Sequence, residues 1–249
     1  MSVNSNALVS IITVCFNSEK YIRQTIDSVI NQTYDNIEYI IVDGASSDST
    51  VDIINEYAKK YPSMIKVISE PDTGIYDAMN KGIKIAKGNL IGLINSDDWY
   101  EKDAVNVIVE AYAESANSVI HGFQRTIQDD VEKNVVRTNI SQINKQMIEH
   151  PTCFLPKLLY EKYGLFNTTY KYGADYELML RLKKAGVDFR TVDSIIANFR
   201  EGGASHKVQA TFEVYDIWYM YGIISFPMLY LNKFGFWLKK KVLSVLRTG

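Results

Sequence analysis

The sequence predicts an α/β protein built on a mostly parallel sheet with helices on both faces. In its first half, short runs of apolar and β-branched residues alternate with segments whose apolar residues recur every three or four positions. The first pattern is typical of buried strands and the second of amphipathic helices. The connections between these segments are short. Strands and helices that alternate in this way form parallel sheets covered on both faces.

The first strand and helix set the pattern. Leu8–Phe16 is almost entirely apolar and is predicted to be a buried strand. Ser18–Asn31 is predicted to be a helix, because its apolar residues recur at helical spacing, with Ser18 as its cap. The elements that follow are strands over Ile37–Val42, Ile65–Ser69, Leu90–Ile94 and Ser118–Phe123, and helices over Ser49–Tyr61, Ile75–Ala86 and Ala104–Glu114.

The second half is less regular. Thr126–Val136 is polar and alternating, which is typical of an exposed hairpin. The remaining expected elements are helices over Pro156–Tyr163 and Asp175–Ala185 and short strands over Phe189–Val192 and Ile195–Phe199. The simplest division is one domain over residues 1–210, with halves of about 1–100 and 101–210, and a tail over 211–249.

The amino-acid composition excludes several classes of protein. Apolar residues make up 47% and charged residues 22% of the chain, so a packed core is expected. The net charge of −2 argues against nucleic acid as the main partner. Cys15 and Cys153 are too few for a disulfide framework. The N-terminus lacks the basic and apolar stretches of a signal peptide, so we expect a cytoplasmic setting.

Polar residues follow the predicted strands, where ligands bind in parallel sheets. Asp43 comes after a buried strand and could accept hydrogen bonds from a ribose or a pyrimidine N–H. The small residues from Gly44 to Ser47 would let a ligand approach the backbone. The alternative is a polar turn, with Asp48 or Ser49 capping the next helix.

The run Asn95-Ser96-Asp97-Asp98 follows the fourth strand. Two adjacent carboxylates repel each other unless a cation or strong donors neutralise them. Oxygen ligands of this type suit Mg²⁺ or Mn²⁺ that is also bound by phosphates. An acidic turn that begins a helix is the alternative. Because the second and fourth strands would end at one crevice, we favour the metal site.

Four motifs occur in order: VSIITVCFN, IIVDGASSDST, EPDTGIYDAMNKGI and GLINSDDWY. Together they resemble the inverting family 2 glycosyltransferases of the GT-A fold, which has a Rossmann-like sheet. The likeness is strongest to small bacterial enzymes that build capsule, O-antigen and exopolysaccharide. It runs from about Val9 to Tyr100 and resumes weakly to about His206. It implies inverting transfer of a sugar from a nucleotide diphosphate-sugar, most often a UDP-sugar, to an acceptor hydroxyl.

The resemblance also assigns roles at the metal motif. Asp97 would occupy the metal-binding position, with Asp98 beside it, and the cation would be Mn²⁺ or Mg²⁺. Asn95 stands where the family has its first acidic residue, which implies weaker metal binding. Asp43 would contact the nucleotide base or ribose.

Three further residues match polar positions near the family's donor site. Asn17 would lie close to the nucleotide. Asp72 and Asn80 match positions around the third strand and the helix that follows it. Local capping and helix packing are the alternatives for these last two.

Inverting transfer needs a base that takes the proton from the attacking hydroxyl. In KYGADYELMLRL, Asp175 opens an apolar helix, where the family commonly has Glu-Asp with the aspartate as the base. Here Ala174 replaces the glutamate. The alternative for Asp175 is a helix N-cap, worth about 1 kcal/mol.

Two histidines and an arginine complete the candidate site. His150, in EHPTCFLP, matches a family histidine near the acceptor or diphosphate, although a lone histidine is more often structural. The segment FREGGASH resembles the family's loop that closes over the donor. Within it, Arg200 would contact the diphosphate and His206 would be a third metal ligand. Both could equally be ordinary surface residues.

The tail combines apolar and basic residues. Ile217–Leu231 is apolar and aromatic, but it falls short of the ~20 residues that span a bilayer. No acidic residue follows Asp216, whereas Lys239–Lys241 form a basic run. These features predict an element over residues 217–247 that lies on an anionic membrane surface, at the inner face of the plasma membrane. A helix pair packed on the core or in a homodimer is the alternative.

The resemblance implies either a saccharide acceptor or one linked to polyprenyl diphosphate, which would suit a membrane surface. A dinucleotide-binding enzyme would need G-x-G-x-x-G after its first strand, and a P-loop enzyme G-x-x-x-x-G-K-[ST]; neither string occurs. A non-catalytic sugar-nucleotide-binding or assembly protein of the same fold stays open, because Asn95 and Ala174 replace two acidic residues of the family.

Overall fold

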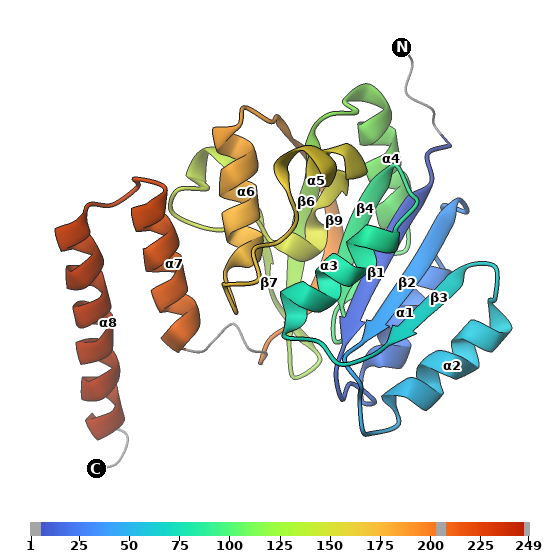
Figure 1. Cartoon of the computed structure of the whole chain (residues 1–249), viewed down its shortest axis with the longest axis horizontal. Coiled ribbons are helices and arrows are strands. Elements are labelled where there is room, and N and C mark those ends of the chain that lie inside the picture. Colours follow the sequence, from blue (N-terminus) through green and yellow to red (C-terminus); the bar gives the residue numbers. More distant parts are fainter. Residues whose placement is uncertain (1–5, 203–207, 247–249) are drawn as a thin grey trace.

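The computed structural model describes residues 6–202 and 208–246 (Figure 1). The strands are β1 (Val9–Cys15), β2 (Ile37–Asp43), β3 (Ile65–Ser69), β4 (Leu90–Asn95), β5 (Trp99–Tyr100), β6 (Val119–Gln128), β7 (Val131–Val136), β8 (Phe154–Pro156) and β9 (Phe189–Arg200). The helices are α1 (Ile22–Ile30), α2 (Thr50–Lys60), α3 (Ile75–Ile85), α4 (Ala104–Glu114), α5 (Lys157–Tyr163), α6 (Ala174–Lys184), α7 (Val208–Met220) and α8 (Phe226–Leu246), with short 3-10 turns at Ile140–Gln142 and His150–Thr152.

The strands form one sheet in the order β3-β2-β1-β4-β8-β6-β9-β5, with β7 paired to β6. The first four are parallel to one another, as are β6 and β9, whereas β5, β7 and β8 pair antiparallel. Every residue of β1 and β2 is buried, because helices cover both faces there. The predicted α/β class and the alternating elements of the first half are confirmed.

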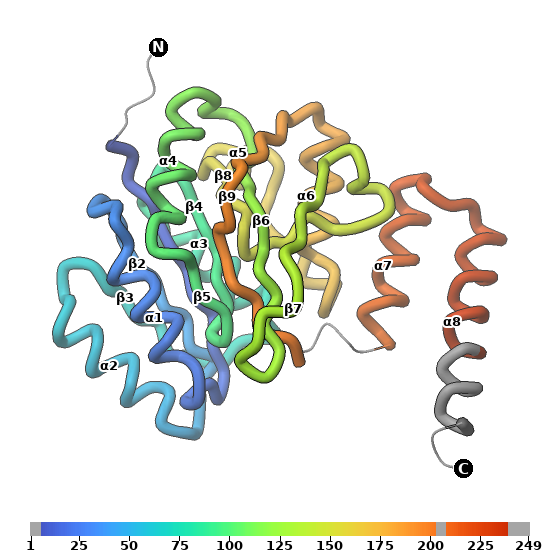
Figure 2. Tube along the Cα trace, turned by 180° about the vertical axis from the view of Figure 1, so that it is seen from behind, coloured from blue at the N-terminus to red at the C-terminus, as the bar shows by residue number. Residues whose placement is uncertain are grey.

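The chain places its helices on both faces by reversing direction along the sheet. It proceeds from β1 through β2 to β3 and then returns to β4 on the other side of β1. The apolar side chains of α1, α2 and α4 pack in one core cluster, and those of α3, α5 and α6 pack in the other. Figure 2 shows the same layers from behind.

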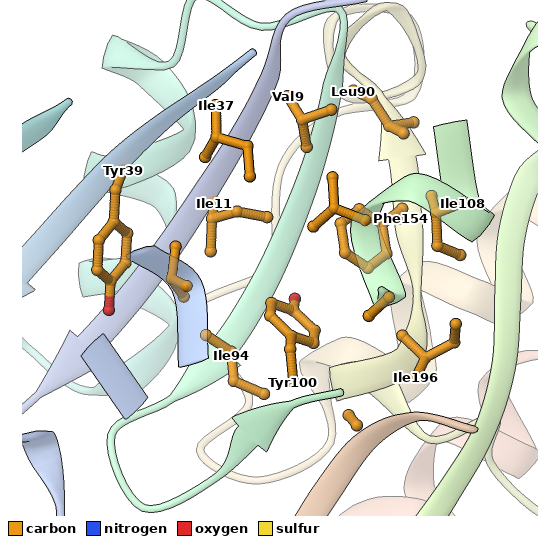
Figure 3. Packing of buried hydrophobic residues seen from close by; sticks show 14 of the residues in the cluster. Val9, Ile11, Ile37, Tyr39, Leu90, Ile94, Tyr100, Ile108, Phe154 and Ile196 are labelled. Atoms are coloured by element: carbon orange, nitrogen blue, oxygen red, sulfur yellow. The ribbon is translucent and has the colours of Figure 1, made fainter. Parts of the chain in front are cut away.

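Figure 3 shows the first of these clusters. Tyr39 and Phe154 are among the largest fully buried side chains, and the ring of Tyr100 packs on that of Phe154 with centroids 5.5 Å apart. Gly92 in β4 makes room for Phe154, because a Cβ at Gly92 would collide with that ring. The core therefore joins the parallel half of the sheet to β8 in the second half.

Two local expectations were wrong. Ser18 does not cap the first helix, because α1 begins at Ile22 after Tyr21 and has no side-chain cap. The Ser18 hydroxyl instead lies 2.8 Å from that of Ser96, so a partner far along the chain competes with the cap. The two strands expected near the end of the domain form the single strand β9, because pairing with β6 continues across register shifts.

The hairpin predicted over Thr126–Val136 is confirmed as β6 and β7. Asp129 and Asp130 form its turn with φ of 51° and 59°, a conformation that aspartate tolerates. The predicted tail is helical. Ile217 of α7 is fully buried against the domain, and α8 packs on α7 as the outermost element (Figures 1 and 2). No helix within the described residues is long and apolar enough to cross a membrane.

Candidate functional site

The carboxyl ends of β1 to β4 meet at one edge of the sheet. In the parallel register, Asp43 lies opposite both Cys15 and Ser69, and Asn95 lies opposite Val14. The loops after these strands therefore start at nearly the same level. The direction of the chain along the sheet reverses between β1 and β4, which is where open α/β sheets bind ligands.

Asp43 ends β2 and is fully buried. Its Oδ1 accepts a hydrogen bond from the Ser46 hydroxyl at 2.5 Å, and its Oδ2 accepts one from the Ser69 hydroxyl at 2.7 Å. The Ser46 N–H also donates to Oδ2 at 3.1 Å. The carboxylate therefore orders the turn after β2. A nucleotide contact at Asp43 stays a prediction, and a nucleotide there would share these oxygens with the two serines.

The loop after β1 is tied to the loop after β2 through Asn17. Its side-chain oxygen accepts a hydrogen bond from the Ser47 N–H at 2.9 Å, and its own N–H donates to the Ser46 hydroxyl at 2.8 Å. The φ of Asn17 is 49°, a left-handed conformation that asparagine tolerates better than most residues. Asn17 thus lies at the predicted edge, with its side chain holding the neighbouring loop.

Phe16, which the sequence analysis did not single out, lies beside Asn17 with 62% of its surface exposed. Its ring borders Gly44, since a Cβ placed on Gly44 would lie 3.5 Å from it. An exposed ring at a strand end offers a face on which a nucleotide base can stack. The available signal was an aromatic residue immediately after a buried strand.

Asp72 brings the loop after β3 to the same edge. A Cβ on Gly44 would collide with the Asp72 carboxylate, so the two loops are in contact only because Gly44 has no side chain. The Asp72 Oδ1 accepts a hydrogen bond from the Gly74 N–H at 2.9 Å, just before α3 begins. This is the local turn that was the alternative to substrate binding, and its carboxylate also faces the candidate site.

The acidic motif after β4 is compact and partly buried. Asn95 Nδ2 donates to Asp98 Oδ2 at 3.3 Å, and the Arg200 backbone N–H donates to Asp98 Oδ1 at 2.9 Å. Burial, reinforced by the charge of Asp97, raises the pKa of the Asp98 carboxyl well above its usual range. Burial also raises the pKa of Asp97, while the charge of Arg200 opposes this. Both shifts arise mainly because burial penalises the charged carboxylates, and at Asp98 the neighbouring charge of Asp97 adds to this.

Arg200 ends β9 beside this motif. Its guanidinium donates to Asp130 at 2.7 Å and to Gln24 at 2.8 Å. It also lies over the rings of Tyr21 and Trp99, with centroid distances of 4.2 Å and 5.1 Å. The side chain is 11% exposed. Arg200 is therefore close to the acidic pair, but a diphosphate would compete with these partners for its guanidinium.

Asp175 lies in the first turn of α6 and is 6% exposed. The helix is capped at Gly173, so the N-cap alternative for Asp175 was wrong. The Tyr76 hydroxyl, from the start of α3, donates to Asp175 Oδ1 at 2.9 Å. His150 Nδ1 lies 3.6 Å from Asp175 Oδ2, beyond hydrogen-bond distance.

His150 is largely buried, with 13% of its side chain exposed. Burial lowers the pKa of its imidazole, although the nearby charge of Asp175 opposes this. Its Nε2 is buried without a hydrogen-bond partner among the described residues. The structure therefore brings His150, Asp175 and Tyr76 together, with Tyr76 supplied by the motif that also carries Asp72.

Asn80 pairs with the backbone of Phe166. Its Nδ2 donates to the Phe166 carbonyl at 2.9 Å, and its Oδ1 accepts from the Phe166 N–H at 3.0 Å. The amide thus links α3 to the segment before α6, which is the packing alternative. A substrate contact at Asn80 stays a prediction.

The predicted residues form a continuous rim. A series of contacts leads from the motif after β4 through Ser18 to the loops of Asn17 and Gly44, then to Asp72 and α3, and through Tyr76 to Asp175. A cavity of about 380 Å³ lies between α6 and α7, and one of about 220 Å³ between α1 and α2; neither lies at this rim.

The acidic motif fits a cation bound through oxygen. Asn95 Oδ1 is buried without a partner among the described residues, and the raised pKa values of Asp97 and Asp98 would be relieved by positive charge. Within residues 6–202 and 208–246, no three His, Cys, Asp or Glu side chains gather as a complete metal site. Asp97 would therefore hold the ion together with oxygens of a phosphate. His206 lies outside the described residues.

The structure thus defines an α/β protein whose open sheet presents carboxylates at its strand ends. The family model described as "Glycosyl transferase family 2" matches residues 10–173. The chain belongs to this family. The match ends at Gly173, two positions before Asp175, so the role of Asp175 as the base stays a prediction.

Curated relatives are consistent with this family. The putative glycosyltransferase EpsH of Bacillus subtilis is 39% identical over 121 residues, which cover 49% of this chain and 35% of EpsH. The hyaluronan synthase of Pasteurella multocida is 27% identical over 202 residues, which cover 79% of this chain and 21% of that protein. The chain therefore spans only about a third and a fifth of the lengths of these two relatives.

Solved structures confirm the fold. TarS of S. aureus in complex with UDP-GlcNAc superposes with a TM-score of 0.69 at 18% identity, covering 86% of this chain and 66% of that one. The mannosyltransferase PcManGT of Pyrobaculum calidifontis, in complex with GDP-Man and Mn²⁺, gives 0.69 at 15% identity, covering 92% and 69%. The GT-A architecture expected from the sequence is thereby confirmed.

Proposed function

We propose that the protein transfers a sugar from a nucleotide diphosphate-sugar to an acceptor hydroxyl, with inversion and with the help of a divalent cation. The observation that carries this proposal is the rim that joins the acidic motif after β4 to the buried carboxylate of Asp175. It provides oxygen ligands on one side and a hydrogen-bonded base on the other. Membership of family 2 supports the same reaction.

Each residue is assigned a role according to its position along the rim. Phe16 offers a stacking surface for the base, and the loops of Asn17 and Asp43 border the space for the ribose. Asp97 would hold Mn²⁺ or Mg²⁺, which supplies positive charge for the leaving diphosphate. Asp175 takes the proton of the attacking hydroxyl, and the Tyr76 hydrogen bond fixes its orientation. A single displacement of this kind inverts the sugar carbon.

One bond forms and one breaks at the sugar carbon in this reaction. The acceptor oxygen forms a bond to the sugar carbon, the bond from that carbon to the diphosphate oxygen breaks, and the acceptor proton moves to Asp175. The nucleoside diphosphate then leaves with the electron pair. Burial lowers the pKa of the His150 imidazole, which favours the neutral form of this side chain beside Asp175.

We propose UDP as the nucleotide of the donor, in line with the UDP-GlcNAc bound to TarS. GDP-sugars are the alternative donors to be compared, because PcManGT is bound to GDP-Man. The test is a thermal-shift screen of UDP-, GDP- and dTDP-sugars with and without Mn²⁺. A donor at 100 times its Kd should stabilise the protein by about 2.7 kcal/mol. We expect UDP-sugars to raise the Tm most, and only fully with Mn²⁺. A larger response to a non-nucleotide ligand, with no metal effect, would contradict the proposal.

We further propose that the product belongs to a cell-surface polysaccharide, with a free or polyprenyl-diphosphate-linked saccharide as acceptor. The support is that the relatives of this chain include a hyaluronan synthase and a chondroitin synthase of Pasteurella multocida. The homodimer, which was the alternative role of the tail, stays a prediction.

We propose that the tail lies on an anionic membrane surface. Its helices expose large apolar side chains, among them Met220 at 68%, Leu231 at 62% and Phe234 at 59%. Basic residues follow in sequence without an acidic one after Asp216. Apolar residues with basic neighbours bind the interface of anionic bilayers. Location at the inner face of the plasma membrane stays a prediction of the sequence.

This proposal is tested by flotation with lipid vesicles. The full chain should float with vesicles that contain phosphatidylglycerol and should be released as the salt concentration rises. Replacing Leu231 and Phe234 with serine should weaken binding to these vesicles while UDP binding is retained. Equal recovery with the wild type and the double variant would refute a membrane role for this surface.

A further inference from the structure

Helix α7, which begins the tail, binds the backbone that leads into α6. The Glu213 carboxylate accepts hydrogen bonds from the N–H groups of Lys171, Tyr172 and Gly173 at 2.9, 2.8 and 3.0 Å. Gly173 is the N-cap of α6, and Asp175 lies in its first turn. The first N–H groups of a helix lack partners within it, and negative charge is favourable at this end. Glu213 therefore anchors the segment that positions Asp175.

The same segment is connected to Asp175 through Tyr76. The Tyr76 hydroxyl lies 2.8 Å from the Tyr172 carbonyl oxygen and 2.9 Å from Asp175 Oδ1. A tyrosine hydroxyl has a single hydrogen, so these two oxygens share one donor. The Tyr172 carbonyl shares its peptide group with the Gly173 N–H, which donates to Glu213 at 3.0 Å. The position of this peptide group thus decides how much of the Tyr76 hydrogen bond Asp175 receives.

Packing leaves α7 little freedom at this point. Ile217 is fully buried, and a Cβ on Gly173 would lie only 2.9 Å from its Cδ1 atom. Trp218 Nε1 donates to the hydroxyl of Tyr176, the residue that follows Asp175, at 2.8 Å. Helix α7 therefore contacts α6 on both sides of Asp175 in sequence.

We propose that Glu213 is a positioning residue for Asp175, and that α7 is therefore part of the acceptor side of the site rather than only the start of an appendage. The inference rests on the proposed function, because it requires Asp175 to act as the base. It adds a residue that lies beyond the family match over residues 10–173.

The experiment compares Glu213→Ala with Glu213→Gln and with Asp216→Asn. Asp216 is the matched control, because it lies on the same helix but pairs with Lys233 of α8 at 2.6 Å. The assay measures release of UDP from the UDP-sugar that gives the largest thermal shift, with Mn²⁺ and with water as the acceptor. We expect Glu213→Ala to lower kcat by about 10²-fold, the usual effect of a small misplacement of a catalytic group.

The KM for the donor should change little in Glu213→Ala, because the nucleotide side of the rim is built by other loops. Glu213→Gln keeps one acceptor oxygen and should recover part of the loss. Asp216→Asn should retain the wild-type kcat. Equal losses in Glu213→Ala and Asp216→Asn would overturn the inference, since they would indicate a general effect of disturbing the tail.

A double variant distinguishes positioning from an independent role. If Glu213 acts through Asp175, Glu213→Ala should cause no further loss in an Asp175→Asn background. If the fold-losses of turnover in the two single variants instead multiply in the double variant, the inference is overturned and the proposed function is unaffected. Wild-type turnover of Asp175→Asn would instead refute Asp175 as the base, and with it this inference, while transfer from a nucleotide-sugar would stand.

Hydrogen exchange gives a readout that does not depend on activity. The amides of Lys171, Tyr172 and Gly173 should exchange faster in Glu213→Ala and at the wild-type rate in Asp216→Asn. Unchanged exchange in Glu213→Ala would show that the carboxylate does not hold this segment and would overturn the inference.

Discussion

Replacing Asp175 with asparagine should lower the rate of sugar transfer by about 10²- to 10⁴-fold, the range typical of removing a general base. Asparagine has the same shape, and its oxygen can still accept the hydrogen bond that Tyr76 now gives to Asp175 at 2.9 Å. The change therefore removes the ability to take a proton with little disturbance of the fold. The measurement is single-turnover release of UDP from the donor in the presence of Mn²⁺.

Two comparisons make this result specific. Glu161→Gln removes a carboxylate on α5 that is 58% exposed and should leave turnover unchanged. UDP binding and the Tm of Asp175→Asn should match the wild type. Turnover retained in Asp175→Asn would rule out the proposed base. A loss of turnover together with a loss of UDP binding would show that Asp175 has a structural role instead.

The second large effect is expected at the metal motif. Asp97→Ala should lower turnover by about 10³-fold, because the proposed cation would contribute several kcal/mol to stabilising the charge on the leaving diphosphate. It should also abolish the additional thermal stabilisation that Mn²⁺ gives in the presence of UDP. Asp98 is a poorer substitute, since it is 1% exposed and its two oxygens accept hydrogen bonds from Arg200 and Asn95.

Asp103→Ala is the matched control for this variant. Asp103 is exposed at the start of α4, makes no side-chain cap and lies outside the rim. Its replacement should leave both turnover and the Mn²⁺ effect unchanged. An Mn²⁺-dependent rise in Tm that persists in Asp97→Ala would place the cation elsewhere and contradict the assignment.

The first half of the fold could be predicted because its signals are local. The strand over Ile65–Ser69 and the helix over Ala104–Glu114 have the bounds that were expected. Continuous apolar runs and helical spacing suffice where both faces of a sheet are buried. The second half was predicted less well: β9 was expected as two strands, because its pairing with β6 depends on residues some 70 positions away.

The residues of the candidate site show the same difference between local signals and contacts with distant segments. Asn17, Asp43, Asp72 and Asp97 were found because polar residues directly after buried strands are visible in the sequence. Tyr76 was missed as a partner of Asp175, since the two are 99 positions apart. Glu213 was missed because nothing in the sequence of α7 distinguishes it from an exposed acidic residue.

The class of fold, the edge of the sheet at which the polar residues gather and the family of the chain could all be recognised from the order of amino acids. The tertiary structure alone decided which of these groups touch: Asp43 with Ser46 and Ser69, Asp175 with Tyr76, and α7 with the backbone before α6. The reason is physical. Periodicity records which face of an element is buried, whereas hydrogen-bond partners are set by how distant segments pack against one another.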